Sequence, residues 1–244
     1  MLALGLAAVI TLTSFMSGVF GMAGGMVLLL VLLAMGLDVA TAMALHGLAQ
    51  ATGNLWRVVT WRRFTRWRIV GYFAGGTLAS VAIFSLFRFE PNRAVVLIML
   101  GLAPFLAMAL PKRWVPQADR PAGGLLCGFA SMAVTLVAGV AGPLVDSFFI
   151  RTGFDRKTIV ATKAGCQLIG NLTKTAYFLA LSGMSVALGP ELLAVALIFP
   201  ILGTFLSKFI LEWMSEAHFQ RYTRFVIGVV GLVSIYNGVM EIYA

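Results

Sequence analysis

Charged side chains are scarce in this sequence, at 11% of its 244 residues. A water-soluble domain usually carries about 25% charged residues. Too few polar side chains are therefore available to cover a globule that faces water on all sides. With 60% hydrophobic residues and a mean hydropathy of +0.96, the composition excludes an ordinary soluble fold and favours a protein embedded in a bilayer.

Residues that support catalysis or bind metals are also few. The chain has two cysteines, Cys127 and Cys166, in apolar surroundings without a CxxC spacing, and two histidines, His46 and His218, in different settings. This pattern contains neither a metal-ligand cluster nor a nucleophile–base pair. We therefore expect no enzyme activity, no metal and no cofactor.

Acidic residues are outnumbered two to one by basic residues, 9 against 18, which gives a net charge of +9. Most basic residues lie in short segments between apolar runs, and no segment is long enough to form a separate basic domain. The excess positive charge is therefore better explained by membrane topology than by nucleic-acid binding.

Long apolar runs recur along the whole chain, and no alternating strand pattern accompanies them. Such runs predict transmembrane helices. The predicted apolar segments cover residues 2–18, 26–36, 39–61, 69–87, 94–110, 122–138, 144–150, 158–180, 191–211 and 225–243. The first is interpreted as a membrane segment and not as a cleaved signal, since it lacks a basic N-terminal region. The expected fold class is an all-α polytopic membrane protein.

A polar motif, Q-x-x-G-N-L, occurs at residues 50–55 and again at residues 167–172, in both cases within apolar sequence. The two copies are 117 residues apart (167 − 50). The same offset relates His46 to Lys163, Arg57 to Lys174, Asp38 to Asp155 and Gly36 to Gly153. Around each copy the polar positions step by 4, 4 and 3 residues, so they share one helical face. We interpret this repeated face as the centre of the protein's function.

Loops rich in arginine and lysine alternate with loops that are neutral or weakly charged. The first group covers residues 62–68, 111–120, 151–157 and 212–224, and the second covers the turn near 38 and residues 88–93 and 181–190. Placing the basic group in the cytoplasm satisfies the positive-inside rule. The two motif-bearing helices then run in opposite directions. Residues 1–120 and 121–244 would thus form two inverted repeats, each a broken hairpin plus three transmembrane helices, with both chain ends outside.

Glycines interrupt the hairpin of each half, at Gly24-Gly25 and at Gly142 before Pro143. Short, glycine-interrupted segments at matching places in inverted repeats are typical of secondary transporters with a midplane site. The alternative is a duplicated structural protein in which the glycines serve helix packing. A short helix that starts at each break would direct its N-terminus and its free amide groups toward an anion.

These segments resemble a known family. FGMAGG (20–25), the following LLLVLLAMGLDVATAMALHGL and the second-half copy ending in QLIGNL are similar to the TauE/SafE sulfite exporters, also called the 4-toluene sulfonate uptake permease family. The resemblance covers nearly the whole chain, although AGVAGP replaces a full glycine triplet in the second half. It implies a bacterial inner-membrane carrier for sulfite or an organosulfonate such as sulfoacetate.

The predicted substrate site combines amide donors with positive charge, as a sulfur oxyanion requires. Direct contact is expected from Gly24, Gly25, His46, Gln50, Asn54, Gly142, Lys163, Gln167 and Asn171. The four amides would otherwise form hydrogen bonds between the two helices. Lys163, with Asp146 as its natural partner, would place the charge of the site on the second-half side.

Asp146, Arg57 and Lys174 are candidates for coupling or gating. Asp146 is a candidate proton carrier, as is His46. Arg57 and Lys174 would either attract anions at opposite entrances or anchor helix ends. The expected partners are a small anion and membrane lipid, while transport direction, proton coupling and a homodimer stay open. The alternative functions are an anion channel and a carrier of a non-sulfur anion.

Overall fold

The computed structural model describes residues 2–20, 23–111, 113–186, 188–211 and 216–243. These residues form ten α-helices and no strand. The helices are α1 (Leu2–Phe20), α2 (Ala23–Ala34), α3 (Val39–Trp61), α4 (Trp67–Leu86), α5 (Arg93–Ala109), α6 (Pro121–Ala138), α7 (Gly142–Phe149), α8 (Arg156–Ala176), α9 (Pro190–Leu211) and α10 (Glu216–Tyr243). The prediction of an all-helical chain is confirmed for this part of the protein.

Both hairpins are broken where the sequence predicts. The helix α2 has 12 residues and α7 has 8, which at about 1.5 Å per residue is too short for a hydrocarbon core of about 30 Å. Each follows a longer helix, α1 or α6. The helix α10 begins at residue 216 and not at 225, so part of the predicted basic loop is helical, whereas residues 212–215 lie outside the described residues.

The same sequence device starts α3 and α8. Asp38 caps α3 by accepting a hydrogen bond from Thr41 N (2.8 Å), and Asp155 caps α8 by accepting one from Thr158 N (3.1 Å). Two residues before each cap, a glycine has a positive φ, which is +84° in one turn and +70° in the other. A residue with a side chain adopts this conformation at a cost. The repeat at an offset of 117 therefore encodes two equivalent turns as well as two polar helix faces.

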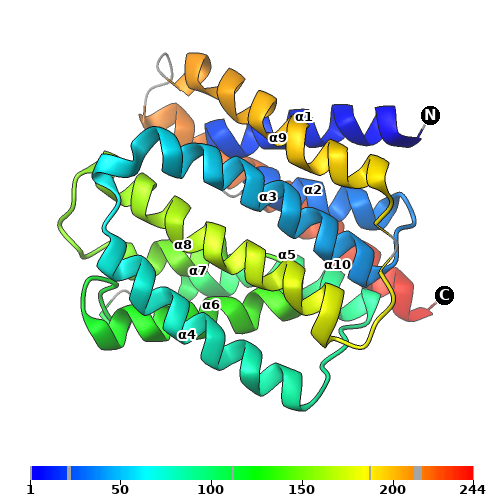
Figure 1. The fold of residues 1–244 in the computed structure, drawn as a ribbon, viewed down its shortest axis with the longest axis horizontal. Helices are drawn as coiled ribbons and strands as arrows, with labels where there is room; N and C mark the ends of the chain where they lie inside the picture. Colours follow the sequence, from blue (N-terminus) through cyan, green and yellow to red (C-terminus); the bar gives the residue numbers. More distant parts are fainter. Residues whose placement is uncertain (1, 21–22, 112, 187, 212–215, 244) are drawn as a thin grey trace.

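Each half of the chain packs on the other. The helix α3 lies against α8 across the middle of the molecule (Figure 1). The first helix of one half packs on the fourth helix of the other, since α1 contacts α9 and α6 contacts α4, while α5 contacts α10. The main apolar core surrounds α2, which is enclosed by protein along most of its length. The halves therefore interlock, and both contribute to the main core and to a second apolar cluster between α4, α6, α7 and α8.

Glycine permits the closest of these crossings. A side chain at Gly76 in α4 would collide with the carbonyl oxygen of Leu125 in α6. A side chain at Gly203 in α9 would likewise collide with the carbonyl oxygen of Thr11 in α1. The contacts α4–α6 and α1–α9 thus bring helix backbones together in the way that small residues allow in membranes.

The outer surface of the bundle is apolar. Large side chains on it include Leu78, Leu86, Leu106, Ile198 and Leu232, each more than half exposed. Four helices in the described residues are long and apolar enough to cross a membrane: Trp67–Leu86, Pro121–Ala138, Pro190–Ser207 and Tyr222–Tyr243. A surface of this kind would associate in water, and it suits lipid. The chain is a multi-pass membrane protein.

Gly76→Leu tests the α4–α6 crossing. The added side chain has no room against the α6 backbone, so we expect the free energy of unfolding to fall by about 1–3 kcal/mol, measured by the unfolding midpoint in detergent. Gly71→Leu on the same helix is the matched control, because nothing lies within 4 Å of its Cβ position. Equal midpoints for the two variants would contradict this helix contact.

The Asp155 cap predicts a pH effect confined to the start of α8. Hydrogen bonds from the side chain and the backbone of Thr158 lower the pKa of Asp155 below its ordinary value. Its stabilisation is therefore full above the ordinary pKa of about 3.9 and is lost as the pH falls through the lowered value. Amide exchange of the first turn of α8 should show this loss in the wild type. Asp155→Asn keeps an acceptor for the cap and should lack the acid dependence.

Candidate functional site

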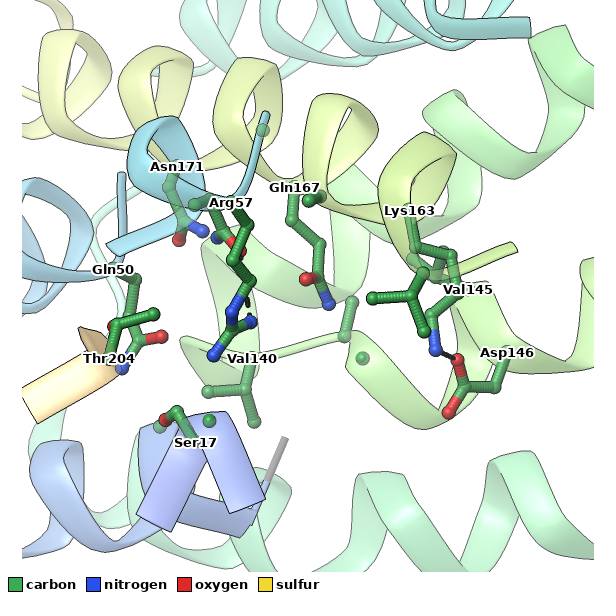
Figure 2. Close-up of a pocket in the computed structure, with 18 of the residues that line it drawn as sticks. Ser17, Gln50, Arg57, Val140, Val145, Asp146, Lys163, Gln167, Asn171 and Thr204 are labelled. Carbon is green, nitrogen blue, oxygen red and sulfur yellow. Dashed lines mark hydrogen bonds and ion pairs between the residues drawn. The ribbon is translucent and has the colours of Figure 1, made fainter. Parts of the chain in front are cut away.

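A cavity of about 560 Å³ lies between the two motif-bearing helices and the broken hairpins. Its wall includes residues of α1, α2, α3, α6, α7, α8 and α9 and of the turn that joins α6 to α7, so both halves contribute. Figure 2 labels side chains from α1, α3, α7, α8, α9 and the α6–α7 turn, and these converge on the same space. The two polar faces that the sequence predicts therefore meet at one site.

Ten of the twelve residues that the sequence singles out line this cavity. They are Gly25, His46, Gln50, Asn54, Arg57, Gly142, Asp146, Lys163, Gln167 and Asn171. Gly24 and Lys174 are not part of the wall. Gly24 packs on α1, where a side chain would collide with the carbonyl oxygen of Thr13, so this glycine serves helix packing.

Of the four motif amides, one forms a side-chain hydrogen bond among the described residues and three do not. Asn54 Oδ1 accepts a hydrogen bond from Arg57 Nη1 at 3.4 Å. Within the described part of the chain, the side chains of Gln50, Gln167 and Asn171 form no hydrogen bond. They do not bridge the two helices, which was the alternative role considered for them. Three amide groups with free N–H donors are thus left facing the cavity.

Arg57 is the central cation of the site. Its guanidinium extends between the Gln50–Asn171 side and the Gln167–Lys163 side in Figure 2. Among the side chains that the structure describes, no carboxylate lies within 4.0 Å of it, and its partner is the neutral Asn54. The sequence suggested an entrance or an anchoring role, but the structure places Arg57 in the cavity wall with its charge uncompensated.

The positive charge of Lys163, unlike that of Arg57, is balanced by a carboxylate. It forms an ion pair with Asp146, which joins α8 to the short helix α7. The predicted pairing is therefore present, with side-chain exposures of 20% for the lysine and 37% for the aspartate. The expectation that the charge of the site lies on the second-half side is wrong in this respect, because the unpaired charge belongs to Arg57 in the first half.

The glycine break of the first half lies directly beside the polar face of α3. A Cβ at Gly25 would be 3.4 Å from Gln50 Nε2 and 3.5 Å from His46 Nε2. His46 Nε2 is 3.0 Å from the carbonyl oxygen of Gly25, to which it donates. The break therefore lets an amide side chain and an imidazole approach the start of α2 from the cavity side.

Lys174 lies at neither an entrance nor a solvated helix end. It is fully buried, with Nζ 2.5 Å from His46 Nδ1 and 3.1 Å from the carbonyl oxygen of Gly139. Gly47 on α3 makes room for it, because a Cβ there would lie 2.9 Å from Lys174 Cε. The equivalence with Arg57 in sequence thus does not extend to position.

Several hydroxyl side chains of the wall are not among the site residues that the sequence predicts. Ser17, Ser131, Thr135, Thr204 and Ser207 also line the cavity. Ser17 Oγ is buried and has no hydrogen-bond partner among the described residues. Serine and threonine are common in apolar helices as packing residues, so nothing in their local sequence distinguishes these positions. The described residues contain no group of three or more His, Cys, Asp or Glu that could hold a metal ion.

The Lys163–Asp146 pair can be tested by its energetics. Lys163→Met leaves the Asp146 carboxylate without a cation, and we expect the free energy of unfolding to fall by about 1–3 kcal/mol. Adding Asp146→Asn should recover most of this loss, since the remaining amide carries no charge. Unfolding midpoints of the two single variants and the double variant measure the coupling. Additive effects would contradict the ion pair.

Comparison with known proteins supplies the family. Residues 6–236 match the family described as Sulfite exporter TauE/SafE. Comparisons with curated proteins and with solved structures found no match. The family match spans both halves, both helix breaks and both copies of the polar motif. The chain therefore belongs to the TauE/SafE sulfite exporter family of membrane transporters.

Proposed function

We propose that this protein is a secondary carrier for a small sulfur-containing anion, sulfite or an organosulfonate such as sulfoacetate. The observation that carries the proposal is the uncompensated guanidinium of Arg57 in a cavity with three free amides. Arg57 is half-buried, and a cation within a membrane protein that has no counterion is costly. An anion in the cavity would remove that cost.

The chemistry of the wall suits an oxyanion. A sulfite or sulfonate group presents several acceptor oxygens, and a guanidinium can donate two parallel hydrogen bonds to such a group. Gln50, Gln167 and Asn171 add N–H donors that carry no charge. Lys163 contributes positive potential that its partner Asp146 partly offsets. The wall is thus richer in donors and positive charge than in acceptors, which favours anions over cations.

The helix contacts support alternating access by two inverted repeats, residues 1–120 and 121–244. If α1 to α5 are exchanged with α6 to α10, the contact of α1 with α9 becomes that of α6 with α4. The contacts α3–α8 and α5–α10 map onto themselves under the same exchange. These relations are what a two-fold axis between α3 and α8 requires. Rocking of one half against the other would then open the cavity to each side in turn.

Orientation follows from the charge pattern. The N-terminal end of α1 and the C-terminal end of α10 lie at the same end of the bundle (Figure 1), as a topology with both termini on one side requires. The arginine-rich turn that contains residues 62–68 lies at the opposite end, which the positive-inside rule places in the cytoplasm. We propose an inner-membrane protein with both termini on the outer side.

Arg57→Gln should weaken anion binding by the purified protein. The loss of a charge-assisted pair predicts an affinity at least about tenfold lower. Arg57→Lys keeps the charge but not the planar pair of donors, so we expect partial retention. Isothermal titration against sulfite, sulfate, thiosulfate, sulfoacetate and taurine, with acetate as the carboxylate control, measures the effect. Leu55→Ala, on the lipid-facing side of the same helix, should bind like the wild type.

Two outcomes would contradict the proposal. A preference for acetate over every sulfur anion would overturn the substrate class. Unchanged binding and transport in a Gln50→Ala, Gln167→Ala double variant and in Arg57→Gln would overturn the site. In proteoliposomes, saturable flux with counter-transport identifies a carrier, whereas an anion current without either identifies a channel.

A further inference from the structure

A buried lysine, Lys174, lies behind the cavity wall. Lys174 is 0% exposed and contacts two groups: His46 Nδ1 at 2.5 Å and the Gly139 carbonyl oxygen at 3.1 Å. His46 is 2% exposed and itself lines the cavity. Among the side chains that the structure describes, no carboxylate contacts either residue. An amine at this place is therefore shielded from water and has no fixed counterion.

The hydrogen bonds restrict where protons can sit. The Gly25 carbonyl oxygen only accepts, so His46 Nε2 must carry hydrogen and donate to it. His46 Nδ1 then has a free lone pair, which accepts from Lys174 Nζ. A neutral amine has two N–H bonds, enough to donate to both Nδ1 and the Gly139 carbonyl. An ammonium does the same with one N–H to spare. The pair thus fits two charge states, neutral and singly positive, without rearrangement.

The surrounding helices supply little that could fix the charge state. On α2 there is no titratable residue. Along α3 the nearest charged residues are the cap Asp38, 8 residues before His46 (46 − 38), and Arg57, 11 residues after it (57 − 46), and along α8 the nearest is Lys163, 11 residues before Lys174 (174 − 163). Asp146 on α7 is paired with Lys163, and Cys127 on α6 contacts Ser131. Tyr177, in the π-helical turn that follows α8, donates to the Phe89 carbonyl.

The cavity can supply the missing negative charge. His46 and Gln50 flank the same backbone position, since a Cβ at Gly25 would lie 3.5 Å from one side chain and 3.4 Å from the other. An anion held by Gln50 would therefore be separated from Lys174 by little more than one imidazole ring. In a low-dielectric interior an opposite charge at such a separation strongly favours the charged form of the amine.

We propose that Lys174 and His46 form a single proton-binding site that is loaded together with the anion, so that the carrier couples each anion to one proton. The inference rests on the proposed anion carrier. The proton comes from water and forms an N–H bond on the lone pair of Lys174 Nζ. By linkage, anion binding and protonation strengthen each other to the same extent, so anion affinity should rise as the pH falls.

The Lys174–His46 pair lies between the breaks of the two hairpins. Gly25 lies at the start of α2, and Gly139, with φ +77°, ends α6 just before α7. The chain of hydrogen bonds from the Gly25 carbonyl through His46 and Lys174 to the Gly139 carbonyl therefore joins the two helix breaks. Loss of the proton weakens a charge-assisted link between them. Both hairpins thus respond to one protonation event.

Proton uptake on anion binding tests the proposal. Purified full-length protein is titrated with sulfoacetate and with sulfite by calorimetry, in pairs of buffers with different ionisation enthalpies, across a pH series. At the alkaline end of the series the wild type should take up close to one proton for each sulfoacetate bound. There its affinity for sulfoacetate should fall by up to about tenfold for each unit of pH increase. Sulfite itself binds a proton, so for sulfite the proton uptake of the Lys174–His46 site is the difference in uptake between the wild type and Lys174→Met.

Lys174→Met should still fold, because it replaces a buried cation without a counterion by an apolar side chain. We expect it to bind the anion more weakly, with no proton uptake and a flat pH profile for sulfoacetate. Lys157→Met, on the exposed first turn of the same helix, is the matched control and should keep both uptake and pH dependence.

The outcomes separate the two proposals. Anion binding by the wild type without proton uptake at any pH would overturn the proton site and leave the anion carrier intact. Uptake that persists in Lys174→Met would place the proton elsewhere and also overturn the site. Failure of the wild type to bind any sulfur anion would overturn the proposed function, and the proton site with it.

Discussion

The cost of placing charge and amide groups inside a bilayer governs this structure. Two helices, α3 and α8, carry the four motif amides and the cations Arg57, Lys163 and Lys174, and they lie against each other in the middle of the bundle (Figure 1). Apolar helices flank them and face lipid, as do the exposed apolar sides of α3 and α8 themselves. Lipid cannot satisfy a polar group, so every donor on α3 and α8 must find a partner inside the protein or in the cavity between the two helices.

That constraint explains why part of the architecture could be predicted from the sequence. The helix α3 has the predicted bounds, 39–61, because its polar face repeats with helical spacing and Asp38 marks its start. The meeting of Gln50, Gln167 and Asn171 at one cavity follows from the same repeat, since polar faces in a membrane have few other places to go. The sequence predicts the start of α10 nine residues late (225 − 216), because the charged residues there are typical of a loop.

The fates of Arg57 and Lys174 could not be predicted, although the two residues are equivalent under the repeat. Space decides between them. Lys174 enters a slot that Gly47 leaves open on α3, whereas position 164, the equivalent of 47 on α8, is an alanine. Lys174 is enclosed behind the cavity wall, whereas Arg57 forms part of that wall. The missing methyl group at Gly47 is invisible to hydropathy and to spacing, yet it provides the room that Lys174 occupies.

The interlocked halves have a consequence for biosynthesis. The helix α1 packs on α9, and 170 positions separate the end of one from the start of the other (190 − 20). When the ribosome has finished the first half, the close-packing surfaces of α1 and α4 therefore have no helix to receive them. Lipid, or the insertion machinery, must cover the surface of α4 until α6 is made, and the surface of α1 until α9 arrives with the last quarter of the chain. Completion of the bundle is thus a late event in synthesis, and a ribosome that stalls after residue 120 releases a fragment with two unfilled grooves.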